Sequence, residues 1–180
     1  RRISFATFCL SIAACGTQPD EVDLAQAIST AEQGIQGGYS DSMDSAVVGV
    51  VSLGGGGLGT CSGTLIAPNV VLTAQHCVAP TLNQVQGGVD CSQTRFGGAH
   101  APSDLYVTTV TQLTQNPNDY HGVMEIVVPP GFDFCGRDMA LMVLAAPVDP
   151  SEARPITPRV DTEMGSGDEY YAIGYGATDD

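Results

Sequence analysis

From residue 35 onward, short apolar or alternating runs of residues are separated by Gly, Pro and Asn. Runs of this length between turn-forming residues are typical of β-strands. The predicted strands cover residues 46–53, 61–66, 69–74, 105–114, 123–128 and 139–145, with a further strand at 170–176. The sequence contains no internal repeat, so the pattern indicates a β-rich region built from strands that differ from one another.

The beginning of the chain has a different pattern. Arg1 and Arg2 precede a mostly apolar run at residues 3–14, which is too short to span a bilayer and is typical of a secretory signal. Small residues directly before Cys15 resemble the bacterial lipobox, in which the cysteine is lipidated. The alternative is an ordinary Ala-x-Ala cleavage site followed by a coincidental cysteine. We therefore expect a signal peptide with a lipobox at residues 1–15.

Residues 16–34 are polar and low in aromatic side chains, which favours a tether or pro-segment with about one helical turn. The protein is expected to be exported, either as an envelope lipoprotein anchored to the membrane through Cys15 or as a secreted protein. No other apolar run is long enough to cross a bilayer.

Charge and composition exclude several classes of partner. The chain has 20 Asp and Glu residues against 6 Lys and Arg residues, a net charge of −14, and such a surface repels nucleic acid and anionic membranes. It is compatible with basic substrates or calcium, although a solvated acidic surface is the commoner explanation. The glycine run at residues 54–57 lacks the lysine and the strand–helix context of a phosphate-binding loop. We expect no cofactor and no nucleic-acid partner.

The most informative segment is residues 61–78, Cys-Ser-Gly-Thr-Leu-Ile-Ala-Pro-Asn-Val-Val-Leu-Thr-Ala-Gln-His-Cys-Val. It resembles the histidine segment of the chymotrypsin-like serine proteases, the trypsin family. The resemblance implies that His76 is the catalytic base and that Cys61 pairs with Cys77. A strand that leads into a disulfide-clamped turn would hold the histidine within the ~3 Å that proton transfer requires. Gln75 departs from the family pattern, which usually has alanine there, and we expect its larger side chain to crowd the end of the strand.

A second segment, residues 135–148, reads Cys-Gly-Arg-Asp-Met-Ala-Leu-Met-Val-Leu-Ala-Ala-Pro-Val and resembles the family's aspartate segment. Asp138 opens an apolar run that predicts a buried strand. The resemblance implies that Asp138 is the triad's acid, which accepts the second N–H of the histidine and fixes its tautomer. The alternative is a turn aspartate that caps the start of the strand. His76 precedes Asp138, which is the order of the family.

The nucleophile segment of the family, of the Gly-Asp-Ser-Gly-Gly type, is absent from the sequence. Ser151 lies in an Asp-Pro-Ser-Glu turn, and Ser166 lies in a loop before residues 170–176. That last stretch resembles the Gly-Trp-Gly segment that opens the family's second barrel, and the nucleophilic serine would follow it. The resemblance therefore implies an all-β, chymotrypsin-like double β-barrel in truncated form. The first barrel would occupy residues 35–155, and an inter-barrel linker with the start of the second barrel would occupy residues 156–180.

Six cysteines are present, and four remain after Cys9 in the signal and Cys15 at the lipobox. Exported chains oxidise their thiols, and four cysteines allow three pairings. The resemblance selects the pair in the histidine segment and leaves Cys91 with Cys135, a bond that would steady Asp138. A zinc site built from the histidine segment fits no standard spacing, and we expect no metal.

The start of the mature protein is a further implication of the resemblance. Ile35-Gln-Gly-Gly is similar to the Ile-Val-Gly-Gly start of the family's mature enzymes, so Ile35 is the expected mature N-terminus. Gly34 precedes it instead of a basic residue. We therefore expect either cleavage by a protease that accepts Gln-Gly or an enzyme that is competent with its tether attached.

The resemblance implies an exported, bacterial-type serine endopeptidase that acts as a monomer on protein or peptide substrates through an acyl-enzyme. The 180 residues alone, without a nucleophile, are expected to be inactive. The alternative is a catalytically inactive homologue that serves as a cell-surface binding module. A third possibility is an unrelated β-rich envelope lipoprotein, which unpaired cysteines would favour. His100 and His121 lie in Gly-, Pro- and Asn-rich stretches and are expected to be exposed.

Overall fold

The structure, a computed structural model, describes residues 41–53, 57–85 and 88–176. The expected signal peptide, lipobox cysteine Cys15, tether and mature N-terminus Ile35 all lie outside these residues. Within the described ranges, no helix is long and apolar enough to cross a membrane.

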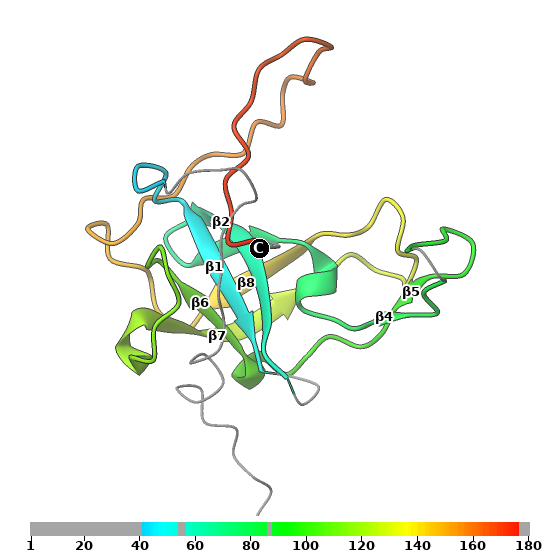
Figure 1. Ribbon diagram of the computed structural model, residues 1–180, viewed down its shortest axis with the longest axis horizontal. Helices are drawn as coiled ribbons and strands as arrows, with labels where there is room; N and C mark the ends of the chain where they lie inside the picture. Colours follow the sequence, from blue (N-terminus) through cyan, green and yellow to red (C-terminus); the bar gives the residue numbers. More distant parts are fainter. Residues whose placement is uncertain (1–40, 54–56, 86–87, 177–180) are drawn as a thin grey trace, which may run out of the picture.

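A closed barrel of six antiparallel strands forms the centre of the molecule (Figure 1). Neighbouring strands are hydrogen-bonded in the order β1-β2-β3-β8-β7-β6, and β6 pairs back onto β1 to close the barrel. The strands are β1 (Val47–Ser52), β2 (Gly59–Ala67), β3 (Val70–Thr73), β6 (Leu105–Thr108), β7 (Tyr120–Val127) and β8 (Ala140–Leu144). The expectation of an all-β fold is confirmed.

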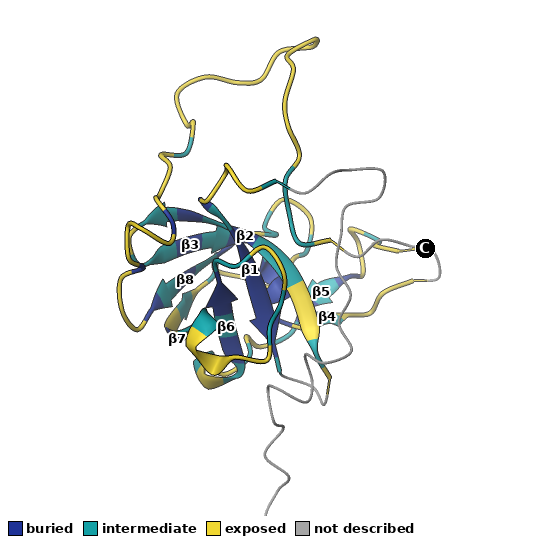
Figure 2. Ribbon diagram, turned by 60° about the vertical axis from the view of Figure 1, so that its left-hand side comes forward, coloured by how far each residue is buried: buried dark blue, intermediate teal, exposed yellow. Residues whose placement is uncertain are grey.

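The barrel interior is the hydrophobic core, and most of the buried residues lie on the barrel strands (Figure 2). Apolar side chains on alternate positions of a strand point to one face of the sheet, here the inside of the barrel. Strand β8 shows the pattern, since its first, third and fifth residues are buried and the two between them are partly exposed. The largest fully buried side chains that the barrel strands contribute to this core are Leu65, Leu105, Met142, Leu144, Val48, Val50, Val71 and Val107.

Each of the six apolar runs before residue 146 overlaps a barrel strand, but β7 begins before its run at 123–128, and the run at 105–114 gives a strand only as far as Thr108. The hydroxyl of Thr108 donates to the carbonyl of Asp119 at 2.7 Å, at the point where β6 pairs with β7. Residues 109–119 therefore form the connection between these strands, and the predicted strand was too long.

A side lobe extends from one end of the barrel and is visible at the right of Figure 1. We use the name for residues 81–85, 88–98 and 129–137. A short sheet of β4 (Thr81–Leu82) and β5 (Arg95–Phe96) lies in it. The Phe96 N–H donates to the Phe132 carbonyl at 2.8 Å, and the rings of Phe96 and Phe134 stack with centroids 4.8 Å apart. The loop that leads to Asp138 is thereby attached to the β4–β5 sheet.

After β8, the chain leaves the barrel in a long excursion and returns beside β2 (Figure 1). Tyr175 marks the return, because its N–H donates to Ser62 Oγ at 2.7 Å and its hydroxyl to the Val110 carbonyl at 2.8 Å. Gly49 gives the ring room, since a Cβ there would lie 3.1 Å from Tyr175 Cδ1.

The strand predicted at residues 170–176 is not formed in the structure. This tyrosine-rich run has no partner strand among the described residues, and a single strand does not satisfy its backbone hydrogen bonds alone. Tyr170 and Tyr171 are exposed, whereas Tyr175 packs on the barrel.

Candidate active site

His76 lies in a tight turn at the end of strand β3. The strand ends at Thr73, whose hydroxyl donates to the Ser62 carbonyl at 2.8 Å, and the chain then enters the 3-10 turn Gln75–Cys77. Cys77 is bonded to Cys61 on the neighbouring strand β2. The strand end and the disulfide thus fix the backbone on both sides of the histidine.

Asp138 contacts His76 through both carboxylate oxygens. Oδ1 accepts the His76 backbone N–H at 2.9 Å, and Oδ2 lies 2.8 Å from His76 Nδ1, across 62 residues of sequence. Two contacts from one carboxylate fix both the position and the rotation of the imidazole. A carboxylate can only accept, so Nδ1 carries the proton in the neutral ring and Nε2 is the free acceptor.

The pair lies at the surface rather than in the core. The side chains of His76 and Asp138 are 48% and 28% exposed. Because Nδ1 faces Asp138, the accessible side of the ring is the one that carries Nε2. The arrangement can take a proton from a group that approaches from solvent, with the carboxylate stabilising the resulting imidazolium.

Two disulfide bonds flank the pair, and they join the same cysteines that the resemblance implies. Cys61–Cys77 closes a sequence separation of 16 with a Cα–Cα distance of 6.0 Å, and Cys91–Cys135 closes one of 44 with 5.5 Å. In the chain-entropy account, loops of these sizes stabilise the fold by about 3 and about 4 kcal/mol. The second bond reaches the chain three residues before Asp138.

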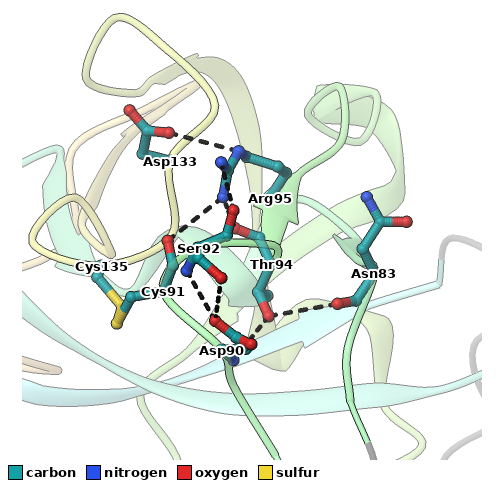
Figure 3. The surroundings of a disulfide bond; sticks show 8 residues. All are labelled: Asn83, Asp90, Cys91, Ser92, Thr94, Arg95, Asp133 and Cys135. Atoms are coloured by element: carbon teal, nitrogen blue, oxygen red, sulfur yellow. Dashed lines mark hydrogen bonds and ion pairs between the residues drawn. A yellow bond between two sulfur atoms is a disulfide. The ribbon is translucent and has the colours of Figure 1, made fainter.

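The surroundings of Cys91–Cys135 are tied together by polar contacts (Figure 3). The Arg95 guanidinium donates to the Ser92 carbonyl at 2.9 Å and to the Thr94 carbonyl at 2.8 Å, and it lies 3.4 Å from Asp133. Asp90 accepts from the Ser92 hydroxyl and backbone N–H, and these hydrogen bonds lower the pKa of its carboxyl. The loop around Cys91 is therefore held by hydrogen bonds of its own in addition to the disulfide.

Gln75 is the residue that departs from the family pattern, and the structure buries it. Its side chain is 3% exposed, and Oε1 has no hydrogen-bond partner within the described part of the chain. A buried carbonyl without a partner costs about 1–3 kcal/mol. The larger side chain is accommodated in the interior, but its amide oxygen has no hydrogen-bond partner among the described residues.

The only group of candidate metal ligands in the described ranges is Cys61, His76 and Cys77, whose ligand atoms lie within 4.8 Å of one another. Both cysteines are joined in a disulfide, so neither offers a thiolate. One imidazole that already contacts a carboxylate remains, which does not make a zinc site.

The prediction that both other histidines are exposed was wrong. His121 lies in strand β7, its side chain is 19% exposed, and its Nε2 lies 3.0 Å from Glu152 Oε2. His100 is half-buried, and its backbone N–H donates to the Val78 carbonyl at 2.8 Å. The Gly- and Asn-rich sequence around His121 did not indicate that strand β7 begins before this residue. In the strand, the side chain of His121 contacts Glu152 in the turn that follows β8.

The two late serines lie in turns, as the sequence indicates. The Ser151 hydroxyl donates to Asp149 Oδ1 at 2.6 Å, which is a local turn contact. Ser166 is exposed in the loop that Gly165 and Asp168 close with a hydrogen bond of 3.2 Å. Neither serine has a contact with His76 within the described part of the chain.

A closed six-stranded antiparallel barrel with a surface His–Asp pair defines a chymotrypsin-like barrel domain. The Trypsin family model matches residues 35–180, and the chain belongs to that family. The chain is also similar to the crystal structure of an inactivated protease paralogue from the scabies mite, with a TM-score of 0.50 and 19% identity over 72% of this chain. It spans 52% of that structure. This likeness concerns the fold, and the expected chymotrypsin-like class is confirmed.

Proposed function

We propose that this domain supplies the general base and the orienting acid of a serine endopeptidase. The contact that supports the proposal most is the double one between Asp138 and His76, at 2.9 Å to the backbone N–H and 2.8 Å to Nδ1. A single contact would suit a surface ion pair, whereas a contact to the backbone and to the ring of one histidine sets the direction of Nε2.

In the proposed reaction, His76 Nε2 takes the proton of a serine hydroxyl as the serine oxygen attacks a peptide carbonyl. Asp138 keeps the proton on Nδ1 and stabilises the imidazolium, which then protonates the leaving amine. Water hydrolyses the acyl-enzyme, with His76 again as the base. The sequence contains no Gly-Asp-Ser-Gly segment, so the proposed reaction requires a serine from outside the 180 residues.

We further propose that the protein is exported and that residues 1–15 are a signal with a lipobox, 16–34 a tether or pro-segment, 35–155 the first barrel and 156–180 the linker to a second barrel. The two disulfides support an oxidising compartment. The expected substrates are proteins or peptides, and the expected state is a monomer.

The second candidate function is a catalytically inactive homologue that serves as a surface binding module. The solved structure with a similar fold is itself described as an inactivated protease paralogue. In this chain, Gln75 occupies a position next to His76 where the family usually has alanine, which adds weight to the alternative.

Labelling with a serine-directed fluorophosphonate separates the two functions. The 180 residues alone should take no label, and the intact gene product should be labelled if it is an enzyme. His76→Ala should abolish both labelling and peptide hydrolysis in the intact protein, because it removes the base and leaves the core unchanged. An intact, folded protein that begins at Ile35 and takes no label would contradict the enzyme and favour the binding module, and labelling of a serine within the 180 residues would refute the assignment.

A further inference from the structure

The two disulfides differ in how far solvent reaches them. Cys91 and Cys135 are both exposed, whereas Cys77 is buried at 8% exposure and Cys61 is half-buried. Thiol–disulfide exchange begins when a thiolate attacks a disulfide sulfur, so its rate depends on access. A dissolved dithiol therefore reaches Cys91–Cys135 before it reaches Cys61–Cys77.

The exposed bond lies next to the residue that orients the histidine. From Cys135 the chain reaches Asp138 through a tight turn, in which Arg137 N–H donates to Phe134 at 3.3 Å and Met139 N–H donates to Arg137 at 2.7 Å. Gly136 adopts a positive φ of 76° within that turn. Because this turn is short, a displacement of Cys135 is expected to move Asp138 as well.

The side lobe would stay attached without the disulfide, but less firmly. The hydrogen bond from Phe96 to Phe132 and the stacking of Phe96 on Phe134 would remain. The ion pair of Arg95 and Asp133 is 35% and 62% exposed, and a pair this exposed contributes little. Loss of the bond is thus expected to loosen the turn before Asp138 and to leave the barrel folded.

We propose that Cys91–Cys135 is a reducible bond that regulates the His76–Asp138 pair, with a dithiol as the reductant. One thiolate of the dithiol attacks one sulfur of the bond, forms a mixed disulfide with that cysteine and releases the other cysteine as a thiolate. The second thiol of the dithiol then attacks the dithiol sulfur of the mixed disulfide and releases the first cysteine. The dithiol is oxidised to its disulfide, and Cys91 and Cys135 gain two electrons and two protons as free thiols. Asp138 then leaves its fixed position, and His76 loses its orientation. The effect on catalysis rests on the proposed function, whereas the effect on the pair does not.

The test titrates the oxidised protein with dithiothreitol, traps free thiols with iodoacetamide and follows amide hydrogen exchange. Peptide mapping should show that Cys91 and Cys135 are alkylated first. At that stage the His76 amide, which donates to Asp138 at 2.9 Å, should exchange about tenfold faster or more. Core amides such as those of Val50 and Leu65 should keep their rates, and reoxidation should restore the rate at His76.

The double variant Cys91→Ser/Cys135→Ser is the matched control. It should show the fast His76 exchange without reductant and no further response to dithiothreitol at that stage. Should this variant fail to fold, the titration of the unaltered protein decides by itself. Alkylation of Cys61 and Cys77 first, or an unchanged His76 amide after selective reduction, would overturn the proposal. An oxidised intact protein that begins at Ile35 and has no peptidase activity would refute the proposed function and leave this coupling standing.

Discussion

The double contact between Asp138 and His76 is the feature of this molecule with the sharpest chemical consequence. In the variant Asp138→Asn, one acceptor oxygen becomes an amide that donates. The imidazole then favours the tautomer with its proton on Nε2, and the nitrogen that should take the serine proton is blocked. We expect kcat of the intact protein to fall by about 10⁴-fold, the size that this substitution has in well-studied serine protease triads. Steady-state kinetics measure it, with circular dichroism as the check on folding. A kcat within tenfold of the parent would contradict the role.

The side chain of Gln75 affects the stability of the fold rather than the chemistry of the site. Its Oε1 is buried and has no partner among the described residues. In Gln75→Met the side chain keeps a similar length and loses the polar atoms, so the desolvation cost disappears. We expect the free energy of unfolding to rise by about 1 kcal/mol. Gln75→Glu is the opposing control, because a carboxylate at this position would be buried without a partner and should lower stability. Urea denaturation measures both, and a destabilised methionine variant would show that the amide has a partner in solution.

At the scale of elements, Tyr175 attaches the segment after β8 to the barrel. Its phenol also makes the stability of the fold depend on pH. Burial is the largest cause that raises the pKa of Tyr175 above its ordinary value of 10.0, and burial likewise raises that of Tyr120. The folded protein therefore favours the neutral phenol. This contribution to stability is complete below pH 10 and is lost as the pH rises through the folded-state pKa.

The sequence contains no lysine, so no lysine side chain contributes to the pH dependence in this range. We expect the free energy of unfolding to fall as the pH rises above 10. Tyr175→Phe should make the decline shallower, because it removes one of the two phenols whose pKa partial burial raises. Tyr171→Phe should not change it, since Tyr171 is 86% exposed. Unfolding curves across the pH range give the comparison, and equal slopes in both variants would contradict the assignment.

The elements also show what the sequence can and cannot predict. The six barrel strands were predictable, because each is an apolar run bounded by turn residues. The end of β6 was not, because Thr108 bonds to Asp119 through a hydroxyl whose partner is eleven residues away. The tyrosine-rich run at 170–176 has a strand pattern without a partner strand in the described structure, and strand pairing is a property of the fold rather than of the run.

For the candidate site, too, the sequence predicts which residues are involved but not the contacts that they make. His76 and Asp138 were identified from local motifs. The two residues are 62 positions apart, and neither motif predicts that one carboxylate contacts both the ring and the backbone N–H of the histidine. The burial of Gln75 and the contact of His121 with Glu152 were likewise hidden, because both depend on which segments the closed barrel brings side by side. A departure from the family pattern at Gln75 was the one local signal that a side chain there would be unusual.

At the scale of the whole molecule, the distribution of basic residues limits how the mature protein can arise. After Arg2, the next arginine or lysine is Arg95, which lies in strand β5 of the side lobe. A trypsin-like activator cuts after Arg or Lys, so it cannot free Ile35. We propose that a protease that accepts Gln-Gly performs the cut, since the glycines after Gln36 give the new end the flexibility that insertion into the fold requires.

We therefore expect Ile35 as the first residue of fully active protein, determined by N-terminal sequencing of material purified from its native host. The uncut form should carry lipid on Cys15, and Cys15→Ser should move it from the detergent phase to the aqueous phase, because a covalent lipid is what holds it there. A variant with Gly34→Arg is the matched control for the cut itself, since added trypsin should then be able to generate the Ile35 end. Full activity in protein that retains lipidated Cys15 would contradict cleavage and would show that the barrel is competent with its acidic tether attached.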